Sequence, residues 1–437
     1  SNRIPFAMNS ELSARRDTAP SSLRSLRQIE GRPRFFSQKC TIHRIFTGGK
    51  QNSTPDHCAR TRFENILSSP VGKELTSPEP TPIVALIPPT TPFVGPEAIE
   101  RQIGRKLNLR LGANESLFGA SPKAIAAMKK KVEWGHFYGD PEAFDLRMAI
   151  AEEHEAGIQN VVLASGIDEL LMLFARCFIA PGEPVVTTLG SYPTFEYAVN
   201  SVGGRLERVT YRDNRVDLEA LLAKTKETRA KVLYLANPDN PSSTWQGVEA
   251  IRNFIDQIPA GVLLLLDEAY YDFAPNGDPF DPTNPQVVRF RTFSKAHGMA
   301  GMRVGYALAH SDHVVTLNKV RMHFGVSGVA QAGALAALQD TEFVKSVIAQ
   351  TRATRSWLSG KMAESGFDSL DSETNFLVTD LGSEPRATGV LMKLREHGVF
   401  IRKPMVAPLD RFIRVTIGRR EDTERFFEIF QGLLQTV

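Results

Sequence analysis

A chain of 437 residues is long enough for two or three domains, and 42% hydrophobic with 23% charged residues is ordinary for a globular protein. No apolar run approaches the roughly 18 residues of a membrane-spanning helix, so we expect no membrane partner. The net charge is +3, but residues 1–75 carry 13 Lys or Arg against 6 Asp or Glu, a balance of +7 that leaves −4 on residues 76–437. This mildly acidic body predicts no nucleic-acid partner.

The three cysteines indicate a reducing compartment. Cys40 and Cys58 lie near the N-terminus, and Cys177 is the third. Three cysteines at these positions cannot form a disulfide framework, and their spacing matches no zinc-binding pattern, so we expect no metal site.

Residues 1–85 are predicted to be a leader outside the folded body. The segment is rich in Ser and Arg, poor in acids, and shows no sustained hydrophobic period. It is either disordered, left from an expression vector, or an organelle transit peptide. The expected location is therefore cytoplasmic, with an organelle as the alternative. Eight prolines between residues 70 and 96 predict an extended arm without helix.

From about residue 97, strand-like and helical segments alternate. Apolar runs occupy residues 161–165, 184–189, 231–237, 261–271 and 287–295, and a helix is expected through Leu170 to Phe178. Continuous apolar strands separated by helices indicate a mostly parallel sheet covered on both faces. The predicted fold is α/β.

The C-terminal part turns more helical. Helices are expected at residues 329–339 and 342–364, a strand at 412–418, and a last helix whose Phe426, Phe427, Phe430 and Leu434 share one face. We expect an N-terminal arm and part of a small domain at residues 86–125. A large domain at 126–315 and a C-terminal small domain at 316–437 follow, so that both chain ends build the smaller α+β domain.

Chemically informative residues follow the predicted strands. Parallel strands gather ligands beyond their carboxyl ends. The candidates at that edge are Asp168 in "SGIDE" (residues 165–169), which opens a helix suited to a phosphate, with Tyr192, Asn240, Asp267, Tyr270 and Lys295.

A lysine and a buried carboxylate at one edge predict pyridoxal 5'-phosphate as the cofactor. The lysine forms a Schiff base only when deprotonated, which a dry or cationic site favours. The carboxylate keeps the ring nitrogen of the cofactor protonated. Small residues after Lys295 are expected to let Arg303 approach the phosphate.

Residues from about 85 to 437 resemble fold-type I aminotransferases, in particular the histidinol-phosphate aminotransferase group. The resemblance lies in "LGANESLFGASPKAI" (111–125), "FYGDPEAFDLRMAIA" (137–151), "SGIDE", "SYPTFEYA" (191–198), "NPDNP", "DEAYYDF", "TFSKAHGMAGMRVGY" and "IRVTIGRRED" (413–422). It implies a large cofactor-binding domain, a smaller domain and an obligatory homodimer with shared active sites.

The resemblance also implies roles for individual residues. Lys295 would bind the cofactor and move protons, and Asp267 would partner the ring nitrogen. Asn240 and Tyr270 would contact the ring oxygen, and Tyr192 would stack on the ring. The phosphate site would comprise Gly166, Ile167, Asp168, Ser294, Arg303 and, from the other subunit, Tyr138. The substrate site would comprise Asn114, Asn240, Arg402 and Arg414.

Two departures from the group bear on the substrate. The usual "NPTG" is "NPSS" at residues 240–243, and Phe93 stands where close relatives have a tyrosine that contacts the substrate phosphate. The expected amine donor is therefore either histidinol phosphate or an aromatic amino acid, with 2-oxoglutarate as acceptor. A decarboxylase of the threonine-phosphate type is the alternative activity, and a non-enzymatic dimeric scaffold is a third.

Overall fold

The computed structural model describes residues 77–89, 94–275 and 281–434. Phe93 and the leader up to residue 76 lie outside these ranges, so the targeting alternative stays a prediction. Within the described part of the chain, no helix is both long and apolar enough to span a bilayer.

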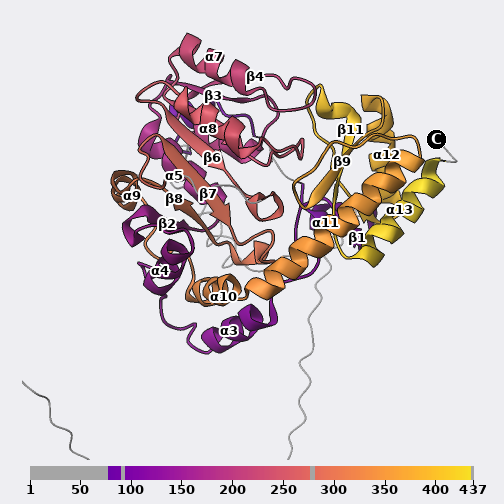
Figure 1. Ribbon diagram of the computed structural model, residues 1–437, viewed down its shortest axis with the longest axis horizontal. Coiled ribbons are helices and arrows are strands. Elements are labelled where there is room, and N and C mark those ends of the chain that lie inside the picture. The colour runs from indigo at the N-terminus through magenta and orange to yellow at the C-terminus, as the bar shows by residue number, and fades with distance from the viewer. Residues whose placement is uncertain (1–76, 90–93, 276–280, 435–437) are drawn as a thin grey trace, which may run out of the picture. The chain divides into compact units, whose positions relative to one another are not determined.

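A seven-stranded sheet forms the centre of the fold, with strand order β2-β8-β7-β6-β5-β3-β4. Its strands are β2 (Val161–Ala164), β3 (Pro184–Thr188), β4 (Arg205–Val209), β5 (Val232–Ala236), β6 (Leu263–Asp267), β7 (Val287–Thr292) and β8 (Gly305–Leu308). Only β8 runs antiparallel to its neighbours, β2 and β7; the other pairs are parallel. The mostly parallel sheet is confirmed (Figure 1).

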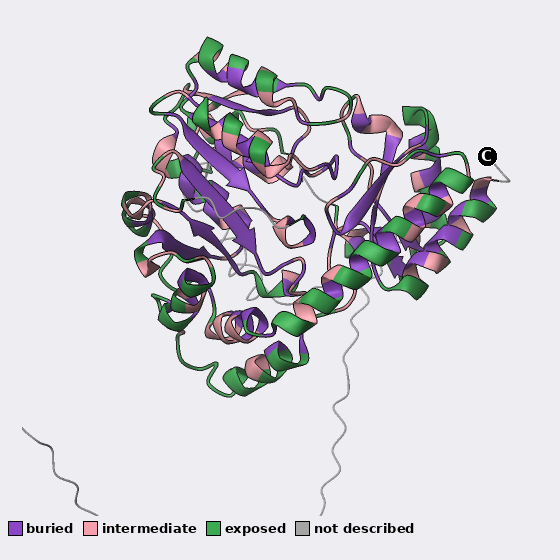
Figure 2. Cartoon of the chain, in the orientation of Figure 1, coloured by how far each residue is buried: buried purple, intermediate pink, exposed green. Residues whose placement is uncertain are grey.

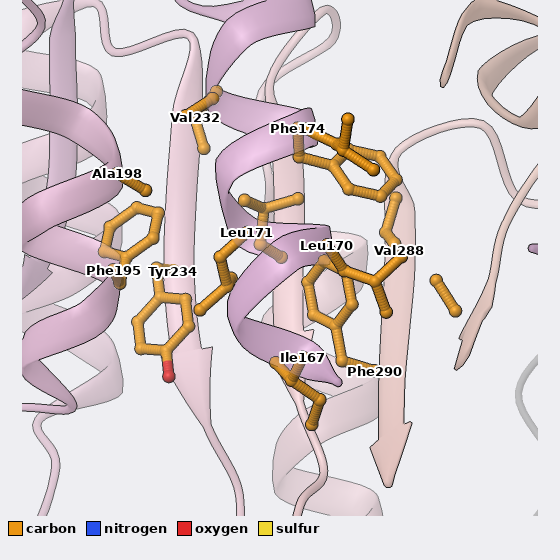
Figure 3. Packing of buried hydrophobic residues seen from close by; sticks show 14 of the residues in the cluster. Ile167, Leu170, Leu171, Phe174, Phe195, Ala198, Val232, Tyr234, Val288 and Phe290 are labelled. Carbon is orange, nitrogen blue, oxygen red and sulfur yellow. The ribbon is translucent and has the colours of Figure 1, made fainter. Parts of the chain in front are cut away.

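Helices cover both faces of this sheet. Strands β5, β6 and β7 are buried at every position, as continuous apolar runs require (Figure 2). One face packs against α5 (Ile167–Phe178), α6 (Pro193–Ser201) and α9 (Ser311–Asn318), and Figure 3 shows Leu170 and Phe174 of α5 beside Phe290 of β7. The alternate side chains of the strands pack against α7 (Leu218–Thr228) and α8 (Val248–Asp256).

A third group of helices packs beside β2 and β8. It comprises α3 (Pro122–Val132), α4 (Phe144–Glu153) and α10 (Gly328–Leu338). The helix expected at residues 329–339 is confirmed, and it packs on α3 and α4. The domain boundaries at residues 126 and 316 stay a prediction.

The smaller domain draws on both chain ends, as predicted. It contains an antiparallel pair, β9 (Phe376–Asp380) with β11 (Phe412–Thr416), and a parallel pair, β1 (Leu109–Arg110) with β10 (Val399–Phe400). Its helices are α11 (Thr341–Glu364), α12 (Glu384–Glu396) and α13 (Arg420–Leu434). Leu109 and Leu111 share one core with Phe426 and Phe430 of α13.

The proline-rich arm contains helix, so the prediction of a purely extended arm was wrong. Helix α1 (Pro82–Ala85) forms one turn inside it, and α2 (Pro96–Ile103) begins at its end. Both helices start at a proline. The first helical position needs no N–H donor and suits the fixed φ of proline, so prolines begin helices there rather than prevent them.

Candidate functional site

The predicted site residues gather in two adjoining cavities at the carboxyl ends of β5, β6 and β7. The first is lined by Ile167, Asp168, Tyr192, Asn240, Asp267, Tyr270, Ser294, Lys295 and Arg303, among others. The second is lined by Asn114, Arg402 and Arg414, and it shares Asp168, Tyr192, Asn240, Tyr270 and Lys295 with the first. The structure thus brings together residues separated by up to 300 positions in sequence. Two predicted site residues line neither cavity: Gly166, which lies against Arg303 at the rim of the first, and Tyr138, which lies apart.

Lys295 and Asp267 reach the first cavity from neighbouring strands. Asp267 is the last residue of β6, and Lys295 lies three residues beyond the end of β7. The lysine Nζ lies 5.5 Å from the centre of the Tyr270 ring. In the described part of the chain no hydrogen bond or ion pair engages Nζ, which leaves the amine available for a ligand.

Asp267 is held in a dry setting. Its exposed fraction is 4%, Oδ2 accepts a 2.8 Å hydrogen bond from the Tyr234 hydroxyl, and Oδ1 accepts one from the Ala269 N–H. Burial raises the pKa of Asp267 to about 6, although both hydrogen bonds act to lower it. A cationic partner in the cavity would reverse that shift by favouring the carboxylate.

The start of α5 forms an anion-binding corner. Gly166 precedes the helix with φ +88°, and no side chain of the described residues caps the N–H groups of the first turn. A Cβ at Gly166 would lie 2.5 Å from Nη2 of Arg303, so only glycine permits this approach. Free helix N–H groups, the helix dipole and a guanidinium together suit a phosphate.

Asp168 aligns the groups around this corner through its side chain. Its Oδ1 accepts a 2.8 Å hydrogen bond from the Tyr192 hydroxyl, and its Oδ2 lies 3.3 Å from Nη2 of Arg303. The carboxylate therefore orients the predicted stacking ring and the predicted phosphate arginine at once. Its backbone N–H, in the first turn of α5, remains directed to the corner.

Among the small residues after Lys295, Gly298 has a packing role of its own, and the predicted role in the approach of Arg303 stays a prediction. Gly298 has φ +68°, and a Cβ there would lie 2.0 Å from the carbonyl oxygen of Gly119. The glycine thus lets the loop at residue 119 pass close to the Lys295 loop. Ser294 is buried, and its hydroxyl accepts from Thr292 at 2.9 Å.

Tyr270 and Asn240 are each oriented by a neighbour. Asn114 is buried and donates from Nδ2 to the Tyr270 hydroxyl at 2.9 Å, which leaves the tyrosine proton free to donate into the cavity. The Oδ1 atom of Asn240 accepts from Nη1 of Arg414 at 2.6 Å. Its amide nitrogen is therefore the group left for a ligand.

Arg414 is a half-buried cation with neutral partners among the described residues. Besides Asn240, its guanidinium donates to the carbonyl of Gly112 at 3.0 Å, and its Nε is buried without a hydrogen bond. Burial lowers the pKa of Arg414 to about 10, so the group stays charged at neutral pH. Arg402 pairs with it across a β-bridge and donates to the carbonyl of Val94 at 3.1 Å.

Ser243, where the resembling group has glycine, adopts a left-handed conformation with φ +66°. It is completely buried, and its Oγ has no hydrogen-bond partner among the described residues. Both features disfavour serine, because a left-handed residue costs about 1–2 kcal/mol and an unpaired buried hydroxyl about 1–3 kcal/mol.

We therefore expect Ser243→Gly to raise the free energy of unfolding by about 1 kcal/mol, since the greater backbone entropy of unfolded glycine offsets part of the gain. Thermal unfolding of the cofactor-free protein measures the change. Ser242→Gly is the matched control. The Ser242 hydroxyl forms a 2.8 Å hydrogen bond with that of Thr244, so removing it should lower the free energy of unfolding. A Ser243→Gly protein less stable than the parent would contradict the explanation.

Tyr138 lies apart from both cavities. Its side chain is 84% exposed and packs against Phe324, with 4.6 Å between ring centres. Trp134 and Phe137, next to it in sequence, are exposed too. Sequence reasoning missed Tyr234, which holds Asp267; a single polar hydroxyl in an otherwise apolar strand was the available signal.

The residues present fit pyridoxal phosphate. The cradle at Gly166 accepts a phosphate, the buried carboxylate of Asp267 suits a protonated ring nitrogen, and Lys295 offers an amine without a partner among the described residues. When bound, this cofactor supplies an electron sink for the carbon that carries the amino group.

Comparisons with known proteins identify the family. Residues 107–430 match the family described as aminotransferase class I and II. Histidinol-phosphate aminotransferase 2 of Carboxydothermus hydrogenoformans is 33% identical over 353 residues, which cover 79% of this chain and 97% of that protein. Histidinol-phosphate aminotransferase 2 of Pseudomonas aeruginosa is 34% identical over 360 residues, covering 79% and 95%.

Solved structures give the same answer. Histidinol-phosphate aminotransferase from Sinorhizobium meliloti, in complex with pyridoxal-5'-phosphate, has a TM-score of 0.78 and 40% identity, and covers 82% of this chain and 99% of that one. Aspartate aminotransferase from Thermus thermophilus with maleate, at 20% identity and a TM-score of 0.68, shares the fold. The chain belongs to the class I and II aminotransferases, and it is a pyridoxal-phosphate-dependent aminotransferase.

Proposed function

We propose that the enzyme takes the amino group from a phosphorylated amine of the histidinol phosphate type and passes it to 2-oxoglutarate. The observation that carries this proposal is Arg414, a half-buried charge that lines the second cavity and whose hydrogen-bond partners among the described residues are neutral. A partly desolvated cation that faces a cavity is stabilised by an anion, so the substrate is expected to supply one.

The position of Arg402 favours a dianion over a single carboxylate. Its guanidinium is near enough for its charge to contribute to the lowered pKa of Arg414, after the larger effect of burial. Two neighbouring guanidinium groups match a phosphate monoester, which carries close to two negative charges at neutral pH. The same pair would hold the distal carboxylate of 2-oxoglutarate in the other half-reaction.

Each remaining residue has a task at a stated atom. Lys295 binds the cofactor through Nζ and then moves the proton at the substrate carbon that carries nitrogen. Asp267 holds the proton on the ring nitrogen. Tyr270 and Asn240 donate to the ring oxygen, since their neighbours occupy the other hydrogen-bonding positions.

We also propose a homodimer in which Tyr138 completes the partner's phosphate site. An 84% exposed tyrosine beside exposed Trp134 and Phe137 forms an aromatic surface that a monomer would leave in water. A second copy of the chain would bury it, and the tyrosine hydroxyl would supply one more donor to the phosphate.

The donor can be tested with a panel of amines and the variant Arg414→Lys. We expect histidinol phosphate to exceed phenylalanine, tyrosine and dephosphorylated histidinol in kcat/KM with 2-oxoglutarate. Lysine keeps the charge but loses the planar fork, so kcat/KM should fall roughly 10- to 100-fold for donor and acceptor alike. Arg411→Lys is the matched control, because Arg411 pairs with Asp380 at the start of β11, outside both cavities.

Two outcomes would overturn the substrate assignment. Preference for an aromatic amino acid would give the role of donor to that class, and release of carbon dioxide without transfer to 2-oxoglutarate would favour the decarboxylase. An Arg414→Lys enzyme that used both substrates normally would remove Arg414 from the anion site. Phe93, the departure that raised the aromatic alternative, lies outside the described residues.

A further inference from the structure

The register in which β6 pairs with β7 sets the position of Lys295 relative to Asp267. Strand β6 presents four consecutive leucines, Leu263 to Leu266, before Asp267. In the observed register Leu264 lies opposite Val287 and Asp267 opposite Phe290, and a shift of β7 by two residues would keep every side chain on its own face of the sheet. Yet such a shift moves the strand by about 6.6 Å, and with it Lys295 relative to Asp267.

A buried ion triad ties β7 to the end of β6 in this register. Glu268 follows Asp267 and points to the opposite face of the sheet, where Arg289 and Arg291 of β7 reach it. Arg289 Nε lies 3.0 Å and Arg291 Nε 2.7 Å from the same oxygen, Oε2, and Arg289 Nη2 lies 3.1 Å from Oε1. All three side chains are at most 8% exposed.

The triad is tied to the backbone on both sides. The Glu268 N–H donates to the carbonyl of Phe290 at 3.0 Å, between the two arginines. The guanidinium of Arg291 stacks 3.4 Å from the centre of the Tyr271 ring, which follows Tyr270 of the active site. Because the arginines are two residues apart on one strand face, a two-residue shift would leave one of them without its carboxylate.

The contribution of such a triad to the free energy of unfolding does not explain its presence. Buried ion pairs often contribute no more than apolar side chains of similar size, whereas their best-attested use is to specify register. The pKa of Glu268 is nevertheless below its ordinary value, because the two arginines outweigh the opposing effect of burial. The carboxylate is therefore charged throughout the working range of pH.

We infer that Glu268 is a positioning residue: by holding Arg289 and Arg291, it fixes the β6–β7 register and hence the placement of Asp267 against Lys295. The inference concerns the cofactor site and does not depend on which amine is the donor. Glu268 itself touches neither cavity.

The test is Glu268→Gln in the holoenzyme, with Arg291→Lys as a milder variant should the first not fold. A misplacement of the reacting groups by about 1 Å costs roughly 10²-fold, so we expect a fall in kcat of that order. KM for both substrates should change little. The dissociation constant for pyridoxal phosphate should rise, and the pH midpoint of the absorbance of the bound cofactor should move.

Glu373→Gln is the matched control. Glu373 pairs with the buried Arg355 at 2.9 Å, away from β6 and β7, so its loss should lower the melting temperature without moving the absorbance midpoint. If both Glu268→Gln and Arg291→Lys lowered only the melting temperature, with kcat, cofactor affinity and absorbance midpoint as in the parent, the triad would be purely structural and the inference wrong.

Discussion

Replacing Lys295 by alanine is expected to abolish transamination and to prevent covalent attachment of the cofactor. The proton transfer assigned to Nζ contributes by itself roughly 10²- to 10⁴-fold, and loss of the covalent attachment adds to this. Borohydride reduction followed by peptide mass spectrometry measures the attachment. A reduced cofactor adduct on any other lysine of the variant would show that the assignment is mistaken.

The same variant tests the proposed shared site. Lys295→Ala retains Tyr138, whereas Tyr138→Ala retains Lys295, and each homodimer should be impaired. A mixed dimer would contain one site with both residues intact, so mixing and refolding the two proteins should restore activity. Mixtures no more active than the separate proteins would indicate that Tyr138 does not serve the partner's site.

The strands that carry the site were predictable because they are apolar throughout. Residues 231–237, 261–271 and 287–295 each contain a buried central strand, and Asn240, Asp267 and Lys295 lie at or just beyond the ends of these strands. Strand β4 was missed because its charged, partly exposed residues resemble a loop. Strand β8 was missed because four residues after a glycine-rich turn carry little periodicity.

The contacts inside the site could not be predicted in the same way. Asn240 and Arg414 are 174 residues apart, and Asn114 and Tyr270 are 156 apart. Sequence pattern places residues at an edge of the sheet, but which side chain hydrogen-bonds to which depends on the packing of the smaller domain against that edge. The left-handed conformation of Ser243 could not be predicted for the same reason, since the residue type does not reveal the φ that its surroundings impose.

Asp267→Asn should reduce turnover by orders of magnitude while the fold persists. Asparagine has nearly the same shape and can still accept the N–H of Ala269, but it carries no charge to keep the ring nitrogen protonated. Electrostatic groups of this kind commonly contribute 10²–10³-fold or more to kcat. Single-turnover rates with the donor measure the loss, and turnover close to that of the parent would rule out the role.

Without the cofactor, the same substitution should stabilise the protein, in a manner that depends on pH. Burial raises the pKa of Asp267 from 3.8 to about 6, so the folded protein holds this proton more tightly than the unfolded chain. Ionisation therefore costs folding free energy, and the cost develops as the pH rises from about 4 to 6 and is constant above that range. Two pKa units correspond to about 3 kcal/mol, the upper limit of the gain expected for Asp267→Asn at pH 8.

Denaturant unfolding of both cofactor-free proteins at pH 4 and pH 8 provides the measurement. If Asp267→Asn raised the free energy of unfolding equally at the two pH values, or more at pH 4, burial would not be destabilising the ionised carboxylate. Any gain in the free energy of unfolding of the cofactor-free Asp267→Asn protein would then have a cause other than removal of the charge that catalysis requires.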